Sequence, residues 1–155
     1  MAAGYATKTA GATALVGAAA KTLVNLISGA TVSPIVVEFS ASFDGVTASA
    51  VPVLVEIGYS TQAGAGTPGT SPTPTLIRGR GTAVCTAAES YSVEPTTLTA
   101  VKHWLVTPNG GLLVIQFPLG REPQPDLSGG TNKAFFLRGN APANVNCRAY
   151  FEHEE

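Results

Sequence analysis

The stretch Ile35-Val36-Val37-Glu38-Phe39-Ser40-Ala41-Ser42-Phe43 indicates the fold class of this chain. From Val37 to Phe43 every second residue is apolar, and the residues between them are Glu or Ser. A period of two is typical of a β-strand that buries one face. Asp44-Gly45 follows directly, and this dipeptide is suited to a turn. The stretch therefore predicts one strand of a half-buried sheet.

Similar runs recur on both sides of this stretch, separated by turn residues. They predict further strands over residues 21–27, 51–59, 75–77, 82–86, 97–106, 112–117, 134–138 and 144–152. The turn Pro108-Asn109-Gly110-Gly111 predicts a hairpin between the strands that flank it. No segment has a convincing helical pattern. The sequence therefore predicts an all-β, two-sheet sandwich of jelly-roll or related Greek-key type, with an immunoglobulin-like sandwich as the alternative.

The 155 residues are enough for one domain with one core. We assign residues 21–155 to a single β-sandwich domain and residues 1–20, rich in Ala, Thr and Gly, to a flexible, irregular N-terminal arm. A signal peptide is poorly supported there, because only Leu15 and Val16 are strongly apolar. Residues 60–74 and 118–130 are rich in Gly and Pro and are predicted to be long loops.

The chain carries few charges. Charged residues make up 12% of the sequence, against about 25% in an ordinary soluble domain, and the net charge is −1. Neither a basic cluster nor a run of ~20 apolar residues is present, so we expect no nucleic-acid partner and no membrane partner. A surface with so few charges favours contact with neighbouring subunits in an assembly.

Catalytic chemistry finds little support in the sequence. His103 and His153 lack the context of a hydrolytic triad. We expect residues 152–155 to form an exposed, hydrated acidic tail, and adjacent residues there would point to opposite faces of a strand and could not converge on one ion. The Gly-rich stretches lack the spacing of a phosphate-binding loop. We therefore predict no enzyme activity, no catalytic residue, no metal and no cofactor. Cys85 and Cys147 could form one bridge, but two free core thiols are the preferred interpretation.

Five residues are candidates for a protein interface. Arg121 and Glu122 lie in a loop stiffened by prolines, which lowers the entropy cost of docking. Arg148 and Tyr150 share one face of the last predicted strand, and both residue types are enriched where subunits meet. Trp104 is the fifth candidate. The alternative for Arg121 and Glu122 is that they are simply hydrated loop charges. The alternative for Arg148 and Tyr150 is that they lie on an ordinary outer sheet face.

Four segments resemble a family of small structural proteins of tailed bacteriophages. They are Ser42-Phe43-Asp44-Gly45-Val46-Thr47-Ala48, Ala50-Val51-Pro52-Val53-Leu54-Val55-Glu56, Gln116-Phe117-Pro118-Leu119-Gly120-Arg121-Glu122-Pro123 and Val145-Asn146-Cys147-Arg148-Ala149-Tyr150-Phe151-Glu152. The resemblance spans residues 35–155. It implies a capsid decoration, or cement, protein of β-sandwich build that is made in the host cytoplasm and binds the major capsid protein on the virion surface. It also implies a homo-oligomer, with a trimer favoured.

Two other functions remain open from the sequence. A phage tail or fibre component would use the same sandwich without catalytic groups. A carbohydrate-binding module would need a platform of exposed aromatic rings, for which Trp104, Tyr59, Tyr91 and Tyr150 are the candidates.

Overall fold

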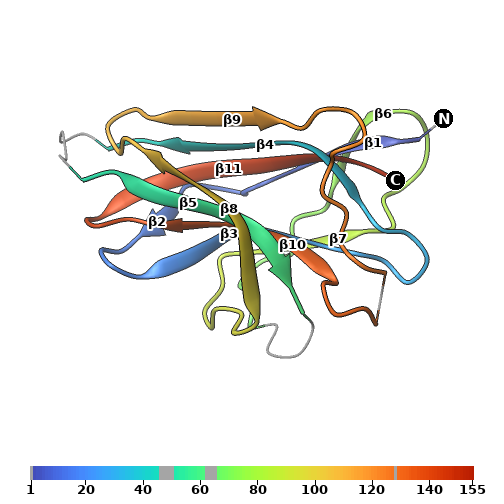
Figure 1. The fold of residues 1–155 in the computed structure, drawn as a ribbon, viewed down its shortest axis with the longest axis horizontal. Helices are drawn as coiled ribbons and strands as arrows, with labels where there is room; N and C mark the ends of the chain where they lie inside the picture. Colours follow the sequence, from blue (N-terminus) through green and yellow to red (C-terminus); the bar gives the residue numbers. More distant parts are fainter. Residues whose placement is uncertain (1, 46–50, 62–65, 128) are drawn as a thin grey trace.

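The computed structural model describes residues 2–45, 51–61, 66–127 and 129–155, and in these ranges the chain forms two antiparallel sheets and no helix. The strands are β1 (Gly4–Lys8), β2 (Thr13–Leu15), β3 (Ala20–Ile27), β4 (Ile35–Phe43), β5 (Val53–Ser60), β6 (Thr75–Arg78), β7 (Thr86–Glu89), β8 (Leu98–Val106), β9 (Leu112–Gln116), β10 (Ala134–Asn140) and β11 (Val145–Glu154). Sheet A has the order β6-β1-β11-β4-β9, with β2 beside β11, and sheet B has the order β7-β3-β10-β5-β8. Figure 1 shows the strands of both sheets.

The pairing of the strands is nested, which identifies the sandwich as a jelly roll. β1 and β2 together pair with the last strand, β11, and the following strands pair inward as β3 with β10, β4 with β9 and β5 with β8. Alternate pairs then join through β11–β4 in sheet A and β10–β5 in sheet B. This is the double Greek-key connection of a jelly roll. The sequence-based prediction of a two-sheet β-sandwich is confirmed.

The core lies between the two sheets and is centred on Phe39 of β4. The ring of Phe39 is 5.3 Å from that of Trp104 in sheet B, 6.0 Å from Phe117 and 6.4 Å from Phe151, measured between centroids. Cys85 and Cys147 are both buried and free, as preferred from the sequence. The period of two in β4 and β11 places the rings of Phe39 and Phe151 on the inner face.

The irregular arm predicted for residues 1–20 is wrong. Gly4–Lys8 and Thr13–Leu15 are strands that pair with β11, and Tyr5 is buried. Without the N-terminal segment, the backbone N–H and C=O groups along one edge of β11 would be unpaired. β1 and β2 supply their hydrogen-bond partners. These residues form strands because of long-range pairing with β11. The local sequence does not indicate it, because Ala, Gly and Thr give only a weak strand signal.

The hairpin predicted around Pro108-Asn109-Gly110-Gly111 is also wrong. The turn exists, but β8 pairs with β5 in sheet B and β9 pairs with β4 in sheet A. The chain thus crosses from the edge strand β8 of sheet B to the edge strand β9 of sheet A. The strand predicted over residues 82–86 begins later, as Thr86–Glu89. In the predicted loop 60–74, Thr67 and Thr70 form isolated bridges to Val93 and Glu89.

Candidate functional site

The two ends of the described chain meet at one end of the sandwich. The amide of Ala3 donates to the carbonyl of Glu155, and the amide of Glu155 donates to the carbonyl of Ala3, at 3.0 and 2.9 Å. β11 continues to Glu154, and His153 is only 1% exposed. The expectation of an exposed acidic tail is therefore wrong, because alternation along β11 directs His153 inward.

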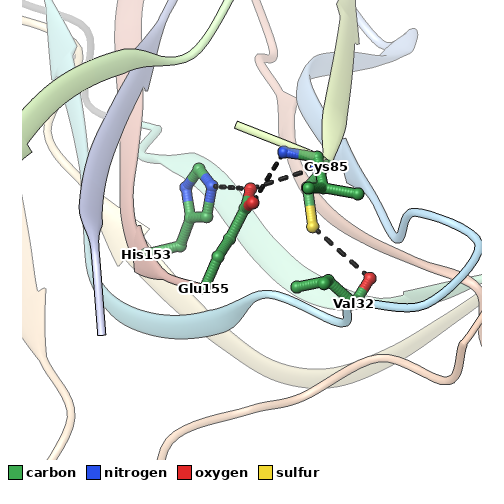
Figure 2. Close-up of polar contacts among 5 residues, drawn as sticks. Val32, Cys85, His153 and Glu155 are labelled. Carbon is green, nitrogen blue, oxygen red and sulfur yellow. Dashed lines mark hydrogen bonds and ion pairs between the residues drawn. The ribbon is translucent and has the colours of Figure 1, made fainter. Parts of the chain in front are cut away.

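His153, Glu155 and Cys85 form the polar cluster drawn in Figure 2. Nε2 of His153 lies 3.3 Å from Oε1 of Glu155. The same carboxylate accepts hydrogen bonds from the backbone amides of Val84, at 2.7 Å, and Cys85, at 3.0 Å. The Glu155 side chain is 6% exposed, and of the two residues whose amides it accepts from, Cys85 is buried and Val84 is 48% exposed. We call this cluster the carboxylate clasp, since it joins β11 to the segment that precedes β7.

A thiol, an imidazole and a carboxylate are the groups of a cysteine hydrolase, but this arrangement does not activate the thiol. Sγ of Cys85 faces the carbonyl of Val32 at 3.6 Å, on the side away from His153 (Figure 2). Burial raises the pKa of the Cys85 thiol to about 12, so the nucleophilic thiolate is scarce at neutral pH. Among the described residues, no group of three or more His, Cys, Asp or Glu could hold a metal ion. The clasp has the geometry of a structural tie.

His153 should make the protein less stable in mild acid. Burial lowers the pKa of His153 from its ordinary value of 6.5, although Glu155 opposes this effect. The unfolded chain therefore binds a proton near pH 6.5 while the folded chain does not, and stability is lost as the pH falls below 6.5 toward the lower, folded-state pKa. Urea unfolding at pH 7 and pH 5 should show this loss in the wild type. In His153→Phe, which keeps an aromatic ring beside Tyr5, the loss should be smaller; an equal loss in both proteins would contradict the assignment.

On the outer face of sheet A, two of the predicted interface residues, Arg148 and Tyr150, lie beside residues that the sequence analysis had not connected with them. In the register of β4 and β11, Arg148 lies beside Ser42 and Tyr150 beside Ser40, and Lys8 of β1 is on the other side of Tyr150. A depression of about 350 Å³ lies over these strands. It is lined by Lys8, Thr9, Ala10, Ser40, Ser42, Leu112, Arg148, Ala149 and Tyr150.

The depression combines cationic, hydroxyl and apolar groups. The Tyr150 hydroxyl donates to Oε1 of Glu38, which fixes the direction of its ring. Arg148 of β11 is exposed, and Leu112 of β9, on the other side of β4, is 65% exposed. A guanidinium, a fixed phenol and an exposed aliphatic side chain are a combination suited to contact with another protein.

The other three predicted interface residues lie elsewhere. Trp104 is on the inner face of sheet B and packs against Phe39, so its ring is half-buried in the core. Arg121 is exposed and Glu122 is half-buried in the loop that follows β9. The structure thus unites Arg148 with Tyr150 but separates both from Trp104.

Exposed apolar residues of β9 and the turn after it were missed from the sequence. Leu112 and Val114 point outward at 65% and 47% exposure, and Leu119 is 96% exposed. The amide of Arg121 donates to the carbonyl of Pro118 at 2.9 Å and Gly120 has φ of 81°, so a tight turn presents Leu119 at its tip. The available signal was the unbroken apolar run from residue 112 to 115, which a single buried face does not explain.

No protein-family model, curated protein or solved structure matches the chain. In the part of the chain that the structure describes, no helix has the length and apolar character needed to cross a membrane.

Proposed function

We propose that this protein is a non-enzymatic structural protein of a tailed bacteriophage, a decoration protein that binds the outside of the assembled head. The four phage-like segments and the low charge of the chain support this proposal, and the β-sandwich is the build that the resemblance implies. Its partner is the major capsid protein, and its location is the virion surface. Binding only to the assembled lattice stabilises that lattice by mass action.

The observation that carries the proposal is the outer face of sheet A. Its central strands place Arg148 and Tyr150 over a depression, and the exposed Leu112 borders it. Exposed aliphatic groups on a sheet face are costly in water unless a partner covers them. A shell of capsid subunits offers such a partner, and the Arg148 guanidinium supplies the polar contact that orients it.

Charge reversal at Arg148 should weaken binding to heads. We expect Arg148→Glu to raise the dissociation constant for undecorated heads at least about 10-fold, which corresponds to about 1.4 kcal/mol, since arginine is enriched among the residues that dominate interface binding energy. The matched control is Arg80→Glu, an equally charged change at an exposed loop position. Cosedimentation of the purified proteins with undecorated heads measures saturable occupancy. The absence of saturable wild-type binding, or unchanged head disassembly temperature with bound protein, would refute the decoration role; equal binding by both variants would refute the proposed face.

The two alternative functions predict other outcomes. A tail or fibre component would appear on the tail when virions are labelled against this chain. A carbohydrate-binding module needs exposed aromatic rings, but Trp104 packs on Phe39 and Tyr91 is 2% exposed. Neither ring offers a platform for a sugar.

A further inference from the structure

Within the residues that the structure describes, each sheet edge except that of β9 has a feature that hinders pairing with another strand. β8 carries an inward-pointing Lys102, over the ring of Phe117, and a register shift at Ile57/Gly58. β7 is covered where Thr70 exchanges backbone hydrogen bonds with Glu89. β6 has four residues and ends at Arg78, and β2 has only three residues. Charges, bulges, short strands and covering segments are the usual protections of a sheet edge.

β9 has none of these protections in the structure described here. Its sequence is Leu112-Leu113-Val114-Ile115-Gln116, without charge or proline. Its pairing with β4 runs from Gln116 to Leu112 without a register shift. Figure 1 shows β9 at the outer margin of sheet A, beside β4. It is therefore a regular apolar edge of the kind that accepts another strand.

The backbone groups available on this edge follow from the register. The amide of Phe117 donates to the carbonyl of Val37, and the amide of Phe43 donates to the carbonyl of Gly111. Odd-numbered residues of β9 thus direct their backbone groups to β4. The even-numbered residues Leu112, Val114 and Gln116 direct their N–H and C=O groups away from β4.

We infer that β9 pairs with β9 of a second copy of this chain, antiparallel and about a two-fold axis at Val114. In this register Val114 faces Val114 of the other copy and Leu112 faces its Gln116. Each of these facing residues is one whose N–H and C=O are directed outward, so the two edges satisfy each other's backbone groups. No like charges meet across the axis, because β9 is uncharged.

The side chains on both faces of β9 suit the same contact. On the outer face, the exposed Val114 side chains become neighbours across the axis. On the inner face, Leu113 meets Ile115 of the other copy, and both are half-buried residues packed against the core. The two-fold also brings Leu119, which follows one end of β9, toward the other copy's turn at Asn109, which precedes the opposite end. A second copy therefore meets Val114 and approaches Leu119, two of the three apolar side chains that the sequence analysis had not identified.

An extended strand from a different protein could occupy the same edge, but a second copy is favoured because pairing about Val114 places Leu113 against Ile115 and brings no charged residue to the axis. A two-fold contact generates dimers or even-numbered assemblies. This differs from the trimer implied by the phage resemblance. The contact forms in solution without heads, so its failure is distinguishable from failure of the proposed function.

Sedimentation equilibrium of three proteins tests the contact. The wild type should be a dimer, and Val114→Lys, which places two ammonium groups across the axis, should raise the dimer dissociation constant about 100-fold or more. Leu105→Lys is the control. Leu105 is 68% exposed on β8, and this substitution also replaces an exposed aliphatic side chain with lysine. It should leave the dimer intact. A monomeric wild type would overturn the inference, and so would equal effects of the two lysine substitutions on the dimer. If the wild type is monomeric and Val114→Lys also loses head binding, the edge is assigned to a capsid strand instead.

Cross-linking keeps the test decisive if Val114→Lys fails to fold. Facing residues of a hydrogen-bonded antiparallel pair have Cα atoms about 5.5 Å apart, which is within the range of a disulfide. Val114→Cys should therefore form a covalent dimer on mild oxidation. Gln116→Cys should not, because its two copies are offset by four residues in this register, or about 13 Å along the strand. Native Cys85 and Cys147 are each 1% exposed and should not interfere. Equal cross-linking at both positions, or at neither, would contradict the register.

Discussion

Phe39→Ala should unfold with a free energy about 4 kcal/mol below that of the wild type. Phe39 is fully buried, and its ring contacts Trp104 from sheet B as well as Phe117 and Phe151. Truncation at Cβ would leave a cavity between the two sheets and remove three aromatic contacts. Urea unfolding followed by fluorescence of Trp104, the single tryptophan of the chain, measures the loss next to the altered residue.

Two further variants distinguish the loss of stability caused by the cavity from the effect of substitution in general. Phe39→Leu keeps an apolar side chain and should cost about 1.5 kcal/mol, because a smaller cavity remains. Leu105→Ala removes an exposed aliphatic side chain and should stay within about 0.5 kcal/mol of the wild type. If Phe39→Ala cost no more than Leu105→Ala, the core would not be centred on this ring.

The strand at Phe39 is also where the sequence was most informative. Its bounds, residues 35–43, agree with the structure, because the apolar alternation of a half-buried strand is a local property. The same alternation correctly placed Arg148 and Tyr150 on one outer face of β11. Their neighbours Lys8 and Leu112 could not be foreseen, because these residues arrive from strands far away in the chain.

The errors share a non-local cause. Tyr5 lies in a strand because β11 offers an unpaired edge nearly 150 residues later, and no local pattern indicates this pairing. The turn at Pro108 was recognised, but turn chemistry does not determine which sheet receives each flanking strand. Glu155 was expected in solvent because acidic tails usually are hydrated. Its burial depends on the Val84 and Cys85 amides, which lie about 70 residues earlier.

Glu155→Ala should lower the free energy of unfolding by about 3 kcal/mol. The Glu155 carboxylate accepts hydrogen bonds from the amides of Val84 and Cys85 and faces the buried His153. Its removal leaves the Cys85 amide and both ring nitrogens of His153 without a partner, since Nδ1 already lacks one in the described structure. Urea unfolding at pH 7 measures the loss. Hydrogen exchange should show faster exchange at the amides of Val84 and Cys85.

The neighbouring Glu154 provides a matched control for this clasp. Glu154 pairs with Arg78 on the outer face, where the Arg78 side chain is 55% exposed. An exposed ion pair contributes at most about 1 kcal/mol, so Glu154→Ala should cost less than Glu155→Ala and leave exchange at Val84 and Cys85 unchanged. In Glu155→Gln one amide oxygen can still accept a hydrogen bond, so its loss should lie between those of the two alanine variants. Equal losses for Glu154→Ala and Glu155→Ala would mean that the clasp is only another surface contact, and that the pairing with β1 and β4 is enough to hold the end of β11 in sheet A.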